Sequence, residues 1–548
     1  MLRQADGGRF SFGVKHRLAL HPITTATRFP VVVLCAAMLV ALVFAASEPA
    51  QAVPSFARQT GQPCGTCHTD YPGLTPFGRL FKLNGYTTGG GRFRTTIFPS
   101  SNDADHALAA YVRNTHGGNG TTLDGRPDTS NMWVPPVSMM AIYGYTHTKA
   151  DQHMASPYHE NDNANLQQLS LFYGGAITDH VGLFSQWTYA NAPYGGSAID
   201  PETGQAIPVT DPCWNCEWAW DNNDLRYANT AMLGDINFIY GISANNNPTV
   251  QDPWNTTPAW GFPYNVSNIT DGCCTPASGG YTLLDGLAQL VGGAGAYVYV
   301  NNFLYLELTG YRTLDFKTLP KLGVDPFDLP GQSVGVMPYW RVAFTPHFGR
   351  SWFEFGAFGM SARFHPWTGE DSVGDGTGFL LDRVFPQTDR YTDFALDSQY
   401  QYQGDNFWLT LRGTYIHESQ TLDASVIQGL SANSSNTVNS FKGYASLAYG
   451  NDNRVVLSGQ YFDVWGTSDM LEYADLASCQ PPDTTCSPDS NGYVFEIAYI
   501  PFISSQSPIW PWANVRLGLQ YTYYNKFDGT TVNAHDNNSL FLYAWFAM

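Results

Sequence analysis

The sequence predicts a transmembrane β-barrel of about sixteen antiparallel strands, a fold of the all-β class. Two features of composition indicate it: only 13% of the 548 residues are charged, whereas 15% are aromatic and 53 are glycine. In addition, no apolar run after residue 46 reaches the length of a membrane-spanning helix. Low charge combined with many aromatic residues and glycines suits a barrel in an outer membrane better than a soluble enzyme.

The chain opens with a predicted export signal. Basic side chains precede residues 29–46, which are apolar, and Ala50-Gln51-Ala52 forms a small-x-small cleavage site. We therefore assign residues 1–52 as a signal peptide. The alternative is a retained membrane anchor, because the apolar run is nearly long enough to span a bilayer.

The chain is strongly acidic. Its formal net charge is −19, and because the signal segment carries five basic and two acidic residues, the remainder carries −22. Such a chain would be repelled by nucleic-acid phosphates, so we exclude nucleic acid as a partner. The acidity favours a protein that meets cations, although acidic loops also serve solubility.

Alternation of apolar and polar residues is the main signal for the barrel strands. It is clear at residues 302–311 and 406–416; in the first, Leu306 and Leu308 alternate with Glu307. Apolar residues facing out and polar residues facing in, over about ten residues, are typical of transmembrane barrels. A soluble β-sandwich has the same period. The export signal and the aromatic strand ends favour the barrel.

Sixteen strands are predicted within residues 132–548, which we assign as a porin-like barrel in the lipid of the outer membrane. Their connections alternate between short and long, and outer-membrane barrels keep the short turns on the periplasmic side. The predicted strands are 135–146, 164–176, 181–190, 224–232, 235–243, 293–300, 303–312, 336–345, 351–364, 391–403, 406–418, 437–449, 454–464, 491–500, 513–524 and 537–547.

The run CGTCH at residues 64–68 is the attachment pattern of a c-type haem. In this pattern Cys64 and Cys67 form thioethers to the haem vinyl groups, and His68 is placed to bind the iron. The alternative is a small disulfide or half of a zinc site. We assign residues 53–131 as a monohaem cytochrome c segment and linker.

The compact part of this segment, residues 54–86, is predicted to be a small α-helical piece. A core of this size would be marginal alone, and a sixteen-stranded barrel leaves a lumen that can be plugged. We therefore expect the cytochrome segment to plug the barrel lumen.

Other residues are candidates for binding the haem. Arg79 and Lys82 could pair with its propionates by charge-assisted hydrogen bonds, or could lie on a solvated helical face. The sixth iron ligand in cytochromes c is commonly His or Met. The nearest candidates, each of which could equally be an ordinary linker or wall residue, are His106, His116, Met132, Met139 and Met140.

Two predicted external loops contain polar residues of interest. The loop after Ile242 is expected either to fold into the lumen as a constriction loop, lining a path near the haem, or to be a packed loop that closes the barrel mouth. Its candidate residues are Asn245, Asn246, Asn247, Asp252, Trp254, Asn255 and Trp260. The first loop has imidazole and carboxylate groups that could attract ferrous iron, but metal-ligand spacing is absent and a solvated loop is favoured. These residues are His147, His153, His159, Glu160 and Asp162.

Six further cysteines fall in predicted external loops. In an oxidising compartment we expect them to form disulfides. A zinc or iron–sulfur site built from the first four is the alternative. The cysteines are Cys213, Cys216, Cys273, Cys274, Cys479 and Cys486.

Two stretches resemble the fused monohaem cytochrome c–porins of iron-oxidising bacteria. Residues 54–87 (PSFARQTGQPCGTCHTDYPGLTPFGRLFKLNGYT) are similar to the haem segment of that family, and residues 241–264 (GISANNNPTVQDPWNTTPAWGFPY) are similar to its barrel region. The order of signal, one haem and porin also matches. The resemblance covers the chain after its signal.

The resemblance implies an outer-membrane ferrous iron oxidase. Cys64 and Cys67 would hold one covalent haem c, with His68 as its iron ligand and catalytic residue. Extracellular ferrous iron would give its electron to a periplasmic cytochrome or other carrier, from a haem segment facing the periplasm or the lumen. Two alternatives remain open: electron exchange with a different extracellular partner, and a passive porin with a structural haem plug.

Overall fold

The computed structural model of the chain describes the N-terminal helices and a barrel. The described residues are 54–60, 62–87, 136–150, 161–190, 198–199, 206–207, 218–270, 282–315, 318–324, 329–366, 387–450, 453–474, 476–479, 484–504 and 507–548. Predictions that fall outside them concern the signal peptide, the linker and several single residues. Those residues are His106, His116, Met132, His153, His159, Glu160, Cys213, Cys216, Cys273 and Cys274.

The barrel strands closely follow the predicted ranges. They are β3 (Val137–Thr148), β4 (Asp162–Ala176), β5 (Val181–Ala190), β8 (Trp218–Leu233), β9 (Ile236–Asn245), β10 (Val291–Val300), β11 (Leu304–Thr313), β12 (Gln332–Ser333), β13 (Met337–Phe344), β14 (His347–Phe348), β15 (Ser351–His365), β16 (Asp389–Gln403), β17 (Phe407–Thr421), β18 (Ser435–Tyr449), β19 (Val455–Gly466), β20 (Ser490–Tyr499), β21 (Asn514–Lys526) and β22 (Ser539–Ala547).

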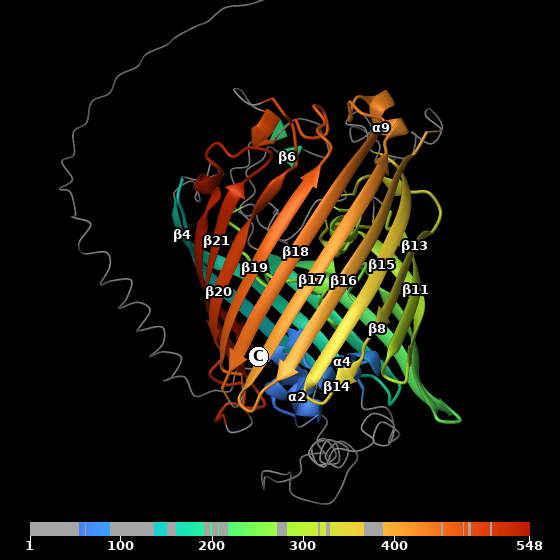
Figure 1. Ribbon diagram of the computed structural model, residues 1–548, viewed down its shortest axis with the longest axis vertical. Coiled ribbons are helices and arrows are strands. Elements are labelled where there is room, and N and C mark those ends of the chain that lie inside the picture. Colours follow the sequence, from blue (N-terminus) through green and yellow to red (C-terminus); the bar gives the residue numbers. More distant parts are fainter. Residues whose placement is uncertain are drawn as a thin grey trace, which may run out of the picture. The chain divides into compact units, whose positions relative to one another are not determined.

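These strands form a closed antiparallel barrel (Figure 1). Successive strands pair as hairpins, and the ring closes where β22 pairs with β3. The short strands β12 and β14 precede and follow β13, and all three pair with β15. Together they therefore occupy one strand position in the ring, and we call each such position a stave. The described residues therefore form a barrel of sixteen staves, which confirms the predicted fold class.

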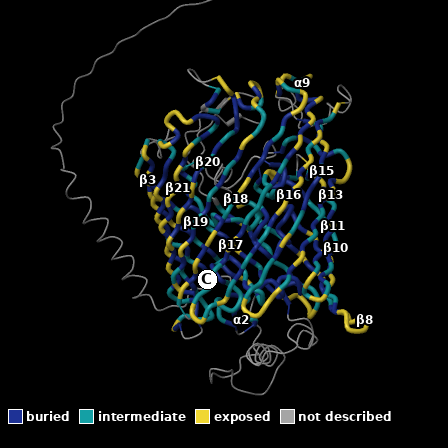
Figure 2. The backbone as a smooth tube through the Cα atoms, viewed as in Figure 1, coloured by how far each residue is buried: buried dark blue, intermediate teal, exposed yellow. Residues whose placement is uncertain are grey.

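The outer face of the barrel is apolar and the inner face is polar. On β11, Leu306 and Leu308 are 38% and 64% exposed, whereas Glu307 between them is 7% exposed. Figure 2 shows exposed and buried positions alternating along the strands. A soluble sandwich would bury the leucines instead, so this orientation is the one expected of a barrel surrounded by lipid. Among the described helices, none has both the length and the apolar character needed to cross a membrane.

The N-terminal segment and the loops contain the remaining elements. The segment comprises α2 (Pro54–Thr60), α3 (Cys64–Cys67), β1 (His68–Asp70), β2 (Gly73–Leu74) and α4 (Pro76–Leu83). The loops contain β6 (Ala198–Ile199), β7 (Ala206–Ile207), η2 (Pro258–Trp260), α7 (Leu283–Gly286), η3 (Pro320–Leu322), α9 (Asp423–Gln428), η5 (Ala477–Cys479) and η6 (Ala534–Asn537).

The helix α4 has clear start and stop signals. Thr75 caps its first turn by accepting a hydrogen bond from the Gly78 amide at 3.1 Å, and Pro76 occupies the first helical position. Gly85 follows its end with a φ of 69°. A Cβ on Gly78 would lie 2.3 Å from the Cys67 carbonyl oxygen, so only glycine lets α4 pack this closely on the CGTCH motif.

The segment 54–87, which we call the plug, lies in the barrel lumen near the short-turn end (Figure 1). Its apolar side chains Phe81 and Leu83 share a buried cluster with wall residues such as Tyr297. The Tyr297 hydroxyl donates to the Leu83 carbonyl at 2.5 Å, and the Tyr86 hydroxyl donates to Asp224 at 2.7 Å. The prediction that a small helical segment plugs the lumen is therefore confirmed.

One predicted disulfide lies within the described residues. Cys479 and Cys486 are bonded to each other in the loop between β19 and β20. Cys64 and Cys67 are not bonded to each other, so both sulfur atoms remain available for other bonds.

Candidate functional site

The CGTCH motif places its three reactive side chains together. Cys64 and Cys67 begin and end the single turn of α3, a spacing of three residues that puts both sulfurs on one side of the helix. His68 follows directly and begins β1, because the chain leaves the helix there for an extended conformation. The two thiols and the imidazole thus belong to one short, ordered corner of the plug.

These three residues line a cavity of about 480 Å³ between the plug and the barrel wall. Cofactor sites commonly have volumes in this range and are mostly apolar, with a few placed polar groups. The wall and loop residues that line it include apolar and aromatic side chains, namely Phe172, Phe184, Met140, Ile142, Trp260 and Trp545, and polar ones such as Gln168, Gln186 and Asp221. Two thiols, one imidazole and flat aromatic walls are the donor set and surroundings that a covalent haem requires, so the residues present fit that group.

Burial sets the protonation of the motif. It lowers the pKa of His68 to about 4, against the opposing effects of the Pro72 and Gly73 carbonyls and of Asp70. The His68 Nδ1–H donates to the Pro72 carbonyl at 3.2 Å. That bond fixes the ring and leaves the Nε2 lone pair of a neutral imidazole free to bind a metal.

The thiols are also neutral in this environment. Burial and the nearby Cys64 raise the pKa of Cys67 to about 12. Neither thiol is therefore poised as a reactive thiolate of the kind found in catalytic cysteines.

The two predicted propionate partners lie in different environments. Lys82 lines the cavity, where its Nζ donates to the Val250 and Asp252 carbonyls at 2.7 and 2.8 Å. Burial, followed by the nearby Arg226, lowers the pKa of Lys82 to about 7. Arg79 does not line the cavity. Its Nη1 donates instead to Gln399 and Gln401 of β16, at 2.7 and 2.6 Å.

Contact with a propionate therefore remains a prediction for Lys82. Arg79 has a different observed role: it ties α4 to the barrel wall. Sequence reasoning could not find this role, because the two glutamines that bind Arg79 are more than 300 residues away.

The loop after β9 folds into the lumen, as the sequence predicts. Asn255 Oδ1 accepts a hydrogen bond from the Leu74 amide at 3.0 Å, and the Trp260 ring lies 4.5 Å from Lys82 Nζ. Asn255 and Trp260 line the cavity. The other five predicted residues are buried but do not line the cavity, which corrects the prediction for them; these are Asn245, Asn246, Asn247, Asp252 and Trp254.

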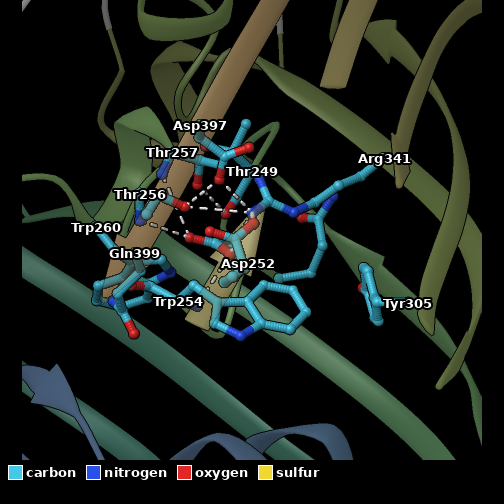
Figure 3. A network of polar contacts seen from close by, with 12 residues as sticks. Thr249, Asp252, Trp254, Thr256, Thr257, Trp260, Tyr305, Arg341, Asp397 and Gln399 are labelled. Atoms are coloured by element: carbon cyan, nitrogen blue, oxygen red, sulfur yellow. Dashed lines mark hydrogen bonds and ion pairs between the residues drawn. The ribbon is translucent and has the colours of Figure 1, made fainter. Parts of the chain in front are cut away.

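A buried charge network holds this loop to the barrel (Figure 3). Arg341 Nη2 lies 2.6 Å from Asp397 on the wall and 3.4 Å from Asp252 of the loop. It also lies 3.2 Å from Glu354, a third buried carboxylate. The Arg341 guanidinium is 5.2 Å from the Trp254 ring. One cation, on β13, thus joins two further barrel strands, β15 and β16, to the loop that contributes to the cavity lining.

Replacing Arg341 with Met should destabilise the folded barrel by about 3–5 kcal/mol, because three buried carboxylates would lose their counter-charge. Thermal unfolding in detergent measures the loss. The matched control is Arg350→Met, which removes an exposed ion pair with Asp405 and should cost no more than about 1 kcal/mol. Equal losses in the two variants would contradict the clamping role of Arg341.

The structure describes two of the five candidates for the sixth iron ligand. On β3, Met139 falls on the same outer face as Val137, which is 51% exposed. Met140 is the next residue, faces the lumen with 4% of its surface exposed, and lines the cavity.

The first loop shows no comparable site in its described part. His147 Nδ1 lies 2.8 Å from Asp162, and both side chains are about half exposed. Within the ranges that the structure describes, no group of three or more His, Cys, Asp or Glu side chains could hold a metal ion.

No protein-family model and no curated protein matches the chain. Solved barrels are similar to it in fold. They include OmpF of Salmonella typhi in its complex with daunomycin (12% identity, 75% of this chain and 96% of that one, TM-score 0.39), the outer membrane channel DcaP of Acinetobacter baumannii (10%, 75% and 96%, 0.40) and OprB of Pseudomonas putida (11%, 75% and 93%, 0.41). The barrel fold of this chain is established by its own closed ring of antiparallel strands.

Proposed function

We propose that this chain is an outer-membrane electron-transfer protein with one covalent c-type haem in its lumen. It takes electrons from extracellular ferrous iron and passes them to a periplasmic cytochrome or another carrier. The observation that carries the proposal is one cavity lined both by Cys64, Cys67 and His68 of the plug and by apolar side chains of the barrel wall. The resemblance of the haem segment to fused cytochrome c–porins supports iron as the donor.

A bound haem supplies one-electron chemistry at its iron, and the protein sets its position and its potential. Cys64 and Cys67 hold it to the plug, and His68 binds the iron through Nε2. The Pro72 carbonyl orients the His68 ring. Burial of the group among aromatic side chains is one of the means by which a protein adjusts haem potential.

The cavity also extends toward the loop end of the barrel. His68 lies near the short-turn end, where its carbonyl accepts a hydrogen bond from Asn453 at 3.3 Å. The same cavity is lined by Asp221, near the loop end of β8, and by Asp285 of α7. Burial, against the effect of nearby Lys442, raises the pKa of Asp285 to about 7. Its negative charge, and with it the attraction for a cation, therefore increases as the pH rises through neutrality.

Anaerobic titration of the oxidised protein with ferrous iron tests the proposal. We expect the absorption bands of reduced haem to appear, up to one electron per chain, and zinc ions at the same concentration to leave the spectrum unchanged. If ferrous iron does not reduce a haem that dithionite does reduce, the donor is a different extracellular partner. A large ion conductance in planar bilayers would instead support a passive porin.

A further inference from the structure

We propose that Met140 is the second axial ligand of the haem iron, so that the barrel wall completes a coordination begun by the plug. This inference rests on the proposed function, because it requires the haem. It assigns one wall residue a role that neither the motif nor its spacing reveals.

The composition of the cavity lining carries the assignment. Axial ligands of c-type cytochromes are drawn mainly from His and Met. Among the described residues that line the cavity, His68 and Met140 are the ones of these two types. They come from different parts of the fold, since His68 belongs to the plug and Met140 to strand β3 of the barrel wall.

The surroundings of Met140 suit a thioether ligand. Its neighbours in a buried cluster include Ile142, Phe172 and Trp545, which are apolar or aromatic. The pleat of β3 directs Met140 and Ile142 to the lumen, as their burial shows. An unbranched Met side chain has three rotatable bonds, so its sulfur can adjust to a planar group that enters beside it.

The plug is anchored at the strand that carries Met140. The Ser55 amide of α2 donates to Ser138 Oγ at 3.2 Å, and Arg58 Nη2 donates to the Val137 carbonyl at 2.5 Å. These bonds lie two and three residues before Met140. They fix the position of the plug relative to the start of β3, and therefore the position of His68 in the plug relative to Met140 in the wall.

The assignment has two consequences. A haem that is covalently bound to the plug and ligated by the wall would lock the plug into the barrel. Met in the axial position also raises the potential of a haem, which favours accepting an electron from a weak reductant such as ferrous iron.

Met140→Leu tests the assignment, with Met139→Leu on the lipid side of the same strand as its matched control. In the wild type and in Met139→Leu we expect the weak near-infrared band of sulfur bound to ferric haem, and no binding of carbon monoxide by the reduced protein. Met140→Leu should lose the band, bind carbon monoxide and show a lower potential. Met140→His should lose the sulfur band but remain six-coordinate.

The assignment is overturned if the wild type lacks the sulfur band or if Met140→Leu retains it. Haem staining of denatured protein separates this failure from failure of the proposed function. Covalent haem with a spectrum unaffected at residue 140 would overturn the ligand alone, whereas a wild type without covalent haem would overturn both. If Met140→Leu does not fold, the assignment is tested by the presence of the sulfur band in the wild type and by its loss in Met140→His.

Discussion

Replacing both Cys64 and Cys67 with Ala is expected to give a folded barrel that carries no covalent haem. The two sulfurs lie on one side of α3 and both line the cavity, so removing them leaves nothing in the motif that can form a thioether. Haem staining after denaturing electrophoresis should fall from a strong band to background, while staining for total protein is unchanged. We expect the loss to be essentially complete, because only haem that is held by thioether bonds stays on the chain after denaturation.

The matched control for this experiment is the other described cysteine pair. Replacing Cys479 and Cys486 with Ala removes a disulfide in a loop outside the cavity and should leave haem staining intact. His68→Ala should keep the stain and lose the low-spin spectrum, because thioethers do not depend on the axial ligand. A haem-stained band from the Cys64/Cys67 double variant would contradict the attachment site. It would favour the alternative interpretation of the motif as a disulfide or half of a metal site.

The barrel could be predicted strand by strand because its signal is local. Each stave alternates apolar and polar residues, and this alternation reports directly which side faces lipid. The largest discrepancy is at β8, predicted from residue 224 but observed from Trp218. Its first six residues, WAWDNN, do not alternate between apolar and polar. They belong to the strand because they pair with β5, where Tyr189 lies opposite Trp218, and pairing with a distant segment is not visible in a local sequence pattern.

The contents of the lumen could be predicted only in part. The motif at residues 64–68 is contiguous, so its three side chains come together without any knowledge of the fold. The choice between Met139 and Met140 required the pleat of a single strand, which the soft boundaries of a sequence pattern leave undecided. The ion pairs of Arg341 and Arg516 join elements up to 446 residues apart, and no local signal marks such pairs.

Replacing Asp70 with Asn is expected to weaken the seating of the plug in the lumen. Asp70 lies two residues after His68 and is buried. Arg516 Nη1 on β21 lies 2.6 Å from its Oδ1, and the Tyr444 hydroxyl on β18 donates to its Oδ2 at 2.7 Å. Arg516 also donates to the Tyr71 carbonyl at 2.5 Å. One carboxylate thus joins the strand that follows the CGTCH motif to two separate barrel strands.

Breaking a buried ion pair from one side costs about 3–5 kcal/mol, because the remaining charge stays desolvated. Glu496 also contacts Arg516 and offsets part of the loss, so we expect about 3 kcal/mol. That is roughly a hundredfold shift toward an unseated plug.

The sixteen staves keep their own hydrogen bonds, so the barrel itself should remain folded. The change should therefore appear as openings in single-channel recordings that the wild type rarely shows. Asp405→Asn, which removes the carboxylate of an exposed pair with Arg350, should leave the recordings unchanged. If Asp70→Asn lowers the unfolding temperature of the whole barrel while the channel stays closed, then Asp70 stabilises the wall rather than holding the plug, and the lumen is closed by the apolar packing of α4 and the inserted loop.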